Sequence, residues 1–235
     1  MLNLGSTDFN LAIKGVDSAT LEGLSNSLFD EWEIYVQQAL ALPDYSLFLQ
    51  IEEGSIIGRG KIMAGAKALV IAVTAYGGLM SGIDIITKQT KSTAGFLGDQ
   101  AQSVFGCPKS NANVTKRGGV PAALNRLFAR VERGELTPDE ASILAQSVLG
   151  GQEEEVPGFF DALSKAFHSC PKRPEQEKLP LGDLNQELDV LVEEGNKAPS
   201  KPKRKPLEVP SLHYRVEVWR ESKNNKKQSK VTLFK

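Results

Sequence analysis

The chain has 235 residues, of which 40% are hydrophobic and 24% charged, and this composition excludes a wholly disordered protein. Its net charge of −1 is the sum of segments of opposite sign. Residues 1–60 have a net charge of −7, from two basic and nine acidic residues, and residues 61–150 have +4, from ten basic and six acidic residues. Residues 151–200 have −6, from five basic and eleven acidic residues, and residues 201–235 have +8, from eleven basic and three acidic residues. The basic last segment predicts contact with phosphates, anionic lipid head groups or the chain's own acidic segments.

The opening residues, MLNLGSTDFNLAIKGVD, contain neither a basic n-region nor a long apolar stretch, so we expect no secretory signal. The two cysteines, Cys107 and Cys170, lie far apart in polar surroundings, and each directly precedes a proline. A secreted chain of this size usually contains more cysteines, so we expect two free thiols in a reducing compartment. We therefore predict a cytoplasmic protein, and association with the inner face of the membrane stays open.

Residues 1–55 have the pattern of a small β-α-β unit. The apolar residues of FNLAIKG alternate with polar neighbours, as in a half-buried strand. Asp17 or Ser18 can cap a helix over ATLEGLSNSLFDEWEIYVQQALAL, whose apolar residues recur at helical spacing. Alternation resumes in YSLFLQIEEGS, so we expect a second strand, paired with the first.

Residues 56–105 are predicted to be an apolar, Gly/Ala-rich helical element. A phosphate-binding loop fits its start poorly, because five residues separate Gly54 from Gly60 where the motif needs four, and Ile62 replaces the magnesium-binding hydroxyl. The uncharged run 68–83 is shorter than the roughly 20 residues of a spanning helix and longer than the roughly 10 to 14 of a core helix. A membrane-associated segment and a soluble, closely packed one therefore both stay open.

Small residues in this element recur at a spacing that lets another helix approach closely. We predict a self-association surface made of Gly60, Ala64, Ala68, Ala72, Gly77, Gly78 and Gly82. The Gly77-Gly78 pair is also expected to break the helix, which gives two shorter helices with a hinge at YGGL. Three roles stay open for this helix pair: a half-inserted membrane hairpin, a self-association surface and a buried two-helix core.

Residues 106–119 have the composition of a linker, with Gly, Pro, Asn and Lys and no apolar periodicity. Residues 120–150 predict a helical hairpin, in which Gly134 ends the first helix and Thr137-Pro138 cap and open the second. The stretch LNRLFARVERGELTPDEASILAQSVL resembles the short helical oligomerisation hairpins known as SHOCT-like domains in its leucine-rich first helix, its glycine before the turn and its acidic, capped second helix. This resemblance, over about an eighth of the chain, implies protein association and not catalysis.

Residues 151–210 predict a linker with two short helices, over VPGFFDALSKAFH and LNQELDVLVEEG, tethered and not packed into a large core. Residues 211–235 alternate on either side of SKNNKKQ and predict a basic β-hairpin, which would dock as edge strands onto the N-terminal sheet or a partner. The predicted contacts with an anionic partner are Lys201, Lys203, Arg204, Lys205, Arg215, Arg220, Lys226 and Lys227. The expected fold class is α+β, mostly helical.

The sequence contains no metal-ligand spacing, nucleophile elbow or dinucleotide fingerprint, and we predict no enzyme, no metal, no cofactor and no small-molecule substrate. We predict a non-enzymatic adaptor or effector that self-associates through the Gly/Ala-rich element, with another copy or another protein as its partner and a membrane surface left open. By analogy, small modular proteins of this build serve in bacterial defence systems. The alternative is a nucleic-acid-binding accessory protein that uses the basic C-terminal tail.

Overall fold

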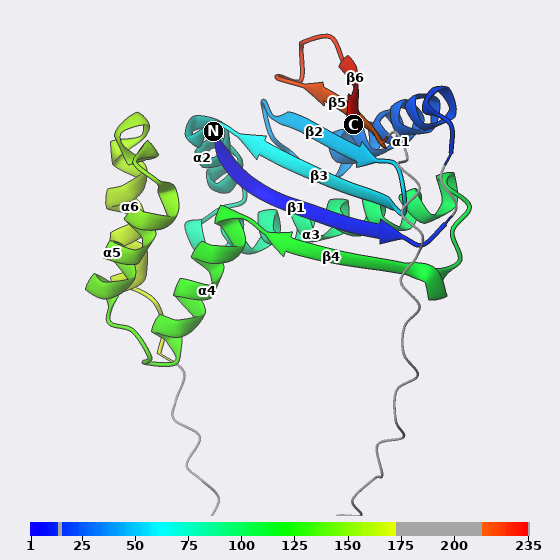
Figure 1. The fold of residues 1–235 in the computed structure, drawn as a ribbon. Helices are drawn as coiled ribbons and strands as arrows, with labels where there is room; N and C mark the ends of the chain where they lie inside the picture. Colours follow the sequence, from blue (N-terminus) through cyan, green and yellow to red (C-terminus); the bar gives the residue numbers. More distant parts are fainter. Residues whose placement is uncertain (14–15, 173–212, 235) are drawn as a thin grey trace, which may run out of the picture. The chain divides into compact units, whose positions relative to one another are not determined.

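A computed structural model describes residues 1–13, 16–172 and 213–234. Six strands form one antiparallel sheet in the order β4-β1-β3-β2-β5-β6 (Figure 1). The strands are β1 (Leu2–Leu11), β2 (Ser46–Glu52), β3 (Ile56–Ala64), β4 (Ala112–Gly118), β5 (His213–Arg220) and β6 (Gln228–Phe234). The helices are α1 (Ser18–Ala39), α2 (Ala66–Ala75), α3 (Leu79–Val104), α4 (Val120–Glu132), α5 (Pro138–Leu149) and α6 (Pro157–His168), with short 3-10 turns η1 (Lys109–Asn111) and η2 (Gln152–Glu155). The predicted α+β class is confirmed.

The first three elements follow the predicted β-α-β order, and Asp17 caps α1 by accepting a hydrogen bond from the Thr20 N–H at 3.0 Å. The predicted pairing of the first two strands is wrong, because β3 lies between β1 and β2 and pairs with both. A tight turn at Gly54, where φ is 121°, returns the chain directly from β2 into β3.

Strand β3 also corrects the helical prediction for the start of residues 56–105, which was wrong over Ile56–Ala64. Burial along this strand alternates with period two, so residues 56, 58, 60, 62 and 64 face the core. Two of these inward positions are glycines, which hide the apolar alternation from sequence. A Cβ on Gly58 would lie 2.0 Å from the Phe9 ring, and one on Gly60 would lie 2.1 Å from Leu97 Cδ2.

Helices α1 and α3 pack against one face of the sheet (Figure 1). The core between these layers includes Trp32 and Phe29 from α1, Leu97 from α3 and Leu49 from β2. Thr7 of β1 donates its hydroxyl hydrogen to the Ala94 carbonyl oxygen of α3 at 3.1 Å, which ties the sheet to the helix. The opposite face of the sheet carries no helix or strand from the described ranges (Figure 1), and we call it the open face.

The linker predicted over residues 106–119 is also wrong, because it contains β4, an edge strand paired with β1. Only Ala112 and Val114 of this strand are partly buried against the core, so its side chains give little apolar pattern. The backbone ladder to β1 defines the strand instead, and that partner lies far away in sequence.

The predicted break at Gly77-Gly78 is confirmed, since α2 and α3 meet there at an angle of 109°. Gly77 takes the left-handed backbone conformation (φ 79°) that favours glycine. Gly82 lets α3 approach α2, because a Cβ at this position would lie 2.1 Å from the Val73 carbonyl oxygen. No single helix in the described ranges is long and apolar enough to cross a membrane, and α2 and α3 meet that criterion only as this bent pair.

The helical hairpin predicted over residues 120–150 is confirmed as α4 and α5. Gly134 ends the first helix with φ at 72°, and Thr137 and Glu140 form a reciprocal capping box at the start of the second. Helix α6 is confirmed as a helix, but it is packed and not merely tethered: the Phe128 and Phe167 ring centroids lie 4.4 Å apart. The second short helix predicted between residues 151 and 210, LNQELDVLVEEG, lies outside the described residues.

The predicted C-terminal β-hairpin is confirmed, and it docks onto the N-terminal sheet through β5, which pairs with β2. Val216 and Val218 are fully buried on the helix side, while Leu233 of β6 lies opposite Tyr214 and is 48% exposed. Asp44 holds the hairpin turn, since its carboxylate accepts hydrogen bonds from the Ser222 hydroxyl at 2.8 Å and the Lys223 N–H at 2.9 Å.

Candidate functional site on the open face of the sheet

The strand registers place side chains from five neighbouring strands in one row across the open face. In this row Arg117 (β4) lies opposite Ser6 (β1), Ser6 opposite Lys61 (β3), Lys61 opposite Phe48 (β2) and Phe48 opposite Trp219 (β5). We call these residues the cation–aromatic row. Because neighbouring strands lie about 4.8 Å apart, the row is about 19 Å wide. Its two basic residues lie toward β4 and its two aromatic residues toward β5.

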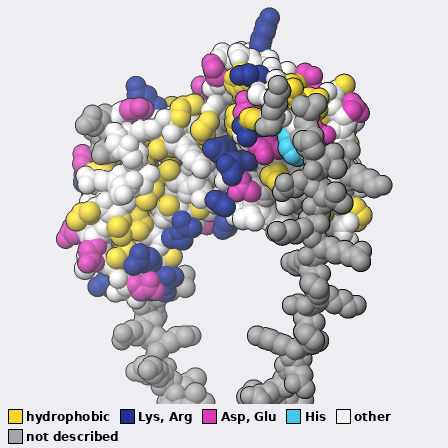
Figure 2. All heavy atoms as spheres, in the orientation of Figure 1, with side chains coloured by type: hydrophobic (Ala, Val, Ile, Leu, Met, Phe, Trp, Pro, Cys, Tyr) yellow, Lys and Arg dark blue, Asp and Glu magenta, His cyan; other side chains and the backbone are white. Residues whose placement is uncertain are grey.

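A second row lies directly beside the first on the same face, with Asp8, Arg59 and Gln50 from β1, β3 and β2. Asp8 binds two arginines, Arg59 at 2.7 Å and Arg117 at 3.3 Å. Lys61 has no ion pair with a carboxylate in the described ranges. Two arginines therefore share one carboxylate, with Lys61 in the neighbouring row, and Figure 2 shows Lys and Arg side chains gathered over the middle of this face.

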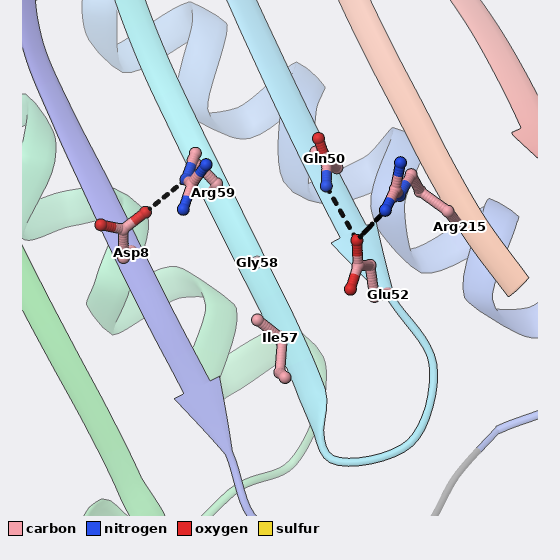
Figure 3. Close-up of a pocket in the computed structure, with 7 residues that line it drawn as sticks. All are labelled: Asp8, Gln50, Glu52, Ile57, Gly58, Arg59 and Arg215. Atoms are coloured by element: carbon pink, nitrogen blue, oxygen red, sulfur yellow. Dashed lines mark hydrogen bonds and ion pairs between the residues drawn. The ribbon is translucent and has the colours of Figure 1, made fainter. Parts of the chain in front are cut away.

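A shallow pocket of about 330 Å³ opens on this face beside the rows (Figure 3). On one side of it, Arg59 binds Asp8. On the other, Glu52 accepts hydrogen bonds from Arg215 Nε at 2.8 Å and from Gln50 Nε2 at 2.9 Å. These contacts hold both guanidinium groups above the sheet, a geometry suited to binding planar anions and polar edges.

Acid–base chemistry has little support in this pocket, because both of its carboxylates are already bound to arginine. The two cysteines are free and buried, which confirms the predicted free thiols. Burial raises the pKa of the Cys170 thiol, and the nearby Glu132 carboxylate raises it further. In the part of the chain that the structure describes, no group of three or more His, Cys, Asp and Glu side chains could hold a metal ion.

The seven small residues predicted for self-association do not form one helical face. Gly60 and Ala64 lie on β3 and point toward the core, Ala72 is buried on α2, and Gly82 is buried where α3 packs against Val73 of α2. The close approach that these four residues permit is therefore used within the chain. Ala68 is partly buried, and Gly77 and Gly78 are exposed at the helix break. Self-association itself stays a prediction.

The predicted anionic contacts of the C-terminal tail divide into three groups. Lys201, Lys203, Arg204 and Lys205 lie outside the described residues. Arg220 binds Glu33 at 2.9 Å and Lys227 binds Asp30 at 2.6 Å, so both fasten the hairpin to α1. Arg215 lies on the open face and binds Glu52, while Lys226 is exposed in the hairpin turn.

The basic half of the cation–aromatic row was not predicted from the sequence. Lys61 was assigned to a helix and Arg117 to a linker, so their common face with Trp219 was not visible. Arg59 and Lys61 alternate with Gly58 and Gly60 in the sequence, but the two glycines remove the apolar half of the alternation that would indicate a strand. No protein-family model, curated protein or solved structure matches this chain.

Proposed function

We propose that this protein is a non-catalytic binding module whose open sheet face binds single-stranded nucleic acid. The observation that carries the proposal is the cation–aromatic row, with Lys61 and Arg117 on one side and Phe48 and Trp219 on the other. Proteins that bind single strands combine a positive surface for the phosphates with aromatic side chains on which bases stack.

The basic and aromatic halves of the row suit a nucleic-acid strand that runs along β3. Arg59 and Lys61 are two residues apart on this strand, about 6.6 Å, so successive phosphates would each meet a cation. The bases would then lie over β2 and β5, where Phe48 and Trp219 are partly exposed. Gln50, beside them on β2, offers an amide for hydrogen bonds to base edges. The proposed function is therefore the nucleic-acid alternative, with its binding site on the open face of the sheet instead of the C-terminal tail.

A binding titration with a fluorescein-labelled 15-residue oligothymidine tests the proposal. We expect Lys61→Glu to weaken binding and Lys67→Glu, a matched charge reversal at an exposed position on α2, to leave it unchanged. Trp219→Ala should weaken binding by about 1–3 kcal/mol, the contribution of one stacked base. Affinity should fall steeply with salt. Equal binding of a duplex of the same length, or equal loss in both lysine variants, would contradict the proposal.

Self-association is retained as a second proposal because one apolar surface remains exposed beside the helix break. Ile71 on α2 is 57% exposed, and a pocket of about 320 Å³ next to it is lined by Val70, Leu79 and Phe159. We propose a second copy of this chain as the occupant. Sizing by light scattering should show a dimer that Ile71→Glu converts to a monomer, and a monomeric wild-type protein would end this proposal.

The proposed compartment is the cytoplasm, which suits two free cysteines. Association with the inner face of the membrane would use the same α2–α3 surface around Ile71. Pelleting with anionic vesicles tests it: wild-type protein would sediment with the vesicles and Ile71→Glu would not. A wild-type protein that stays in the supernatant at low salt would exclude membrane association.

A further inference from the structure

A second basic site lies on the other side of strand β4 from the open face. It is a pocket of about 380 Å³ between α3, β4 and α4, lined by Lys91, Lys116 and Arg126 together with the polar side chains of Thr87 and Asn125. No Asp or Glu of the described ranges lines it. We call it the β4 pocket.

The cations of the β4 pocket are not neutralised by direct ion pairs. None of the three is within ion-pair distance of a carboxylate in the part of the chain that the structure describes. Asp84 interacts electrostatically with Lys91, but its carboxylate is held directly by Lys88 at 2.6 Å and by the Asn125 amide at 3.2 Å. Lys116 lies over Gly95 of α3, where a Cβ would come within 3.1 Å of its ammonium nitrogen. Three positive side chains therefore meet in one concave space, which favours an anion.

The edge strand β4 connects this pocket to the open face. Consecutive residues of a strand point to opposite faces, so Arg117 belongs to the cation–aromatic row while Lys116 points into the β4 pocket. Because β4 is the last strand on this side of the sheet, no further strand of the described ranges separates the two basic sites. Positive charge therefore continues from Lys61 through Arg117 and around the edge to Lys91 and Arg126.

We propose that the β4 pocket binds a backbone phosphate of the same single strand that lies on the open face, so that a longer strand wraps around the β4 edge. This inference rests on the proposed function and adds a path and a longer binding site to it. A short strand would contact only the cation–aromatic row, and a long one would reach both sites.

The experiment compares oligothymidines of 5 and 15 residues on the full chain. The test variant is Lys91→Gln with Arg126→Gln, and the matched control is Lys67→Gln with Lys165→Gln, which removes two charges from helices α2 and α6. A longer oligomer gains some affinity only because it offers more positions at which the same site can bind. We expect wild-type protein and control to bind the long oligomer more tightly than this gain explains. The test variant should lose that excess and keep its affinity for the short oligomer. Its salt slope for the long oligomer should be shallower by about 0.7, the contribution of one phosphate contact to a single strand.

The outcomes separate this inference from the proposed function. If the test variant binds both oligomers as the wild type does, with an unchanged salt slope, the wrapped path is wrong and the open-face site stands. If the wild type binds neither oligomer at low salt, both proposals fail. If the test variant loses as much affinity for the short oligomer as for the long one, the β4 pocket is part of the primary site, and the wrapped path is again contradicted. Circular dichroism of each variant at the assay temperature shows whether it is folded.

Discussion

The two tryptophans of this chain lie on opposite faces of the same sheet and have different surroundings. Trp32 is 1% exposed between α1 and the sheet, where a Cβ on Gly60 would come within 3.3 Å of its ring. Trp219 lies on the open face, partly exposed, opposite Phe48 and in the same row as Lys61 and Arg117. The helix-covered face holds the fold together, while the open face has side chains arranged for contact. Substitutions on the first should change stability, and substitutions on the second should change binding.

The largest expected effect is on the covered face. Trp32→Ala should lower the free energy of unfolding by about 3–5 kcal/mol, because it removes a large buried ring and leaves a cavity. Trp219→Ala, its counterpart on the open face, should cost about 1 kcal/mol or less, since its ring is only partly buried. Urea unfolding followed by circular dichroism measures both. Similar losses for the two variants would mean that the faces do not differ as described.

A second comparison uses neighbouring residues of one strand. Gly60→Ala places a methyl group against Leu97 and should cost about 1–3 kcal/mol through overpacking. Arg59→Ala, one residue earlier and on the open face, should change stability by about 0.5 kcal/mol or less, because its ion pair is largely exposed. Thermal unfolding of the wild type and the two variants in one buffer measures both losses. A Gly60→Ala protein as stable as the wild type would contradict the close packing of α3 on β3.

The third comparison uses two arginines of β5. Arg220 binds Glu33, whose side chain is 8% exposed, and Arg220→Ala should cost about 1–3 kcal/mol after allowance for its own partial exposure. Arg215→Ala breaks a more exposed pair with Glu52 and should cost about 0–1 kcal/mol. Denaturant midpoints at pH 7 distinguish them. A larger loss of stability for Arg215→Ala than for Arg220→Ala would contradict the view that Arg220 stabilises the fold and Arg215 serves contact on the open face.

The Arg220 effect should also depend on pH. Burial raises the pKa of Glu33, and Arg220 acts in the opposite direction, so removing the arginine raises that pKa further. A carboxyl with a raised pKa favours the folded state most when it is protonated, and this contribution is lost as the pH rises above its ordinary value of 4.5. The destabilisation by Arg220→Ala should therefore be full at pH 7, shrink as the pH falls through the raised folded-state pKa of Glu33, and be smaller at pH 4. A loss that is the same at pH 7 and pH 4 would contradict the link to Glu33.

Among the variants expected to destabilise the fold, the smallest effect concerns the hairpin turn. Burial alone would raise the pKa of Asp44, but hydrogen bonds from the Lys223 N–H and the Ser222 hydroxyl outweigh it, and the pKa is lowered. This contribution to stability is present above the ordinary value of 3.8 and is lost as the pH falls through the lowered pKa. Asp44→Ala should cost about 0.5–1.5 kcal/mol at pH 7 and almost nothing in strong acid. Thermal unfolding at both pH values measures the difference, and an equal loss at both would contradict the role of the ionised carboxylate.

Elements with local signals could be predicted from the sequence. The Asp17 cap, the Gly134 and Thr137 boundaries and the alternation in β5 are each visible within a few residues. Strand β3 could not be recognised from its own residues, because the inward positions Gly58 and Gly60 are small to admit Phe9 and Leu97 from distant parts of the chain. Strand β4 likewise depends on its backbone pairing with β1.

The candidate site could be predicted only in part, for the same physical reason. Arg215 was identified from the basic tail, and the aromatic character of the hairpin at Trp219 is visible in sequence. The row that joins Trp219 to Lys61 and Arg117 depends on the register of four strand pairs, and a shift of one residue in any of them would move a side chain to the other face. Such long-range registers are not contained in local patterns.

The most direct test of the central claim uses Trp219 as the only tryptophan. In a Trp32→Phe background, which keeps an aromatic ring in the core, we expect titration with a 15-residue oligothymidine at low salt to quench the remaining fluorescence. Adding Lys61→Glu should abolish that quenching, while adding Lys67→Glu should leave it intact. Fluorescence that does not change at low salt, or quenching that both lysine variants retain equally, would contradict a nucleic-acid site on the open face.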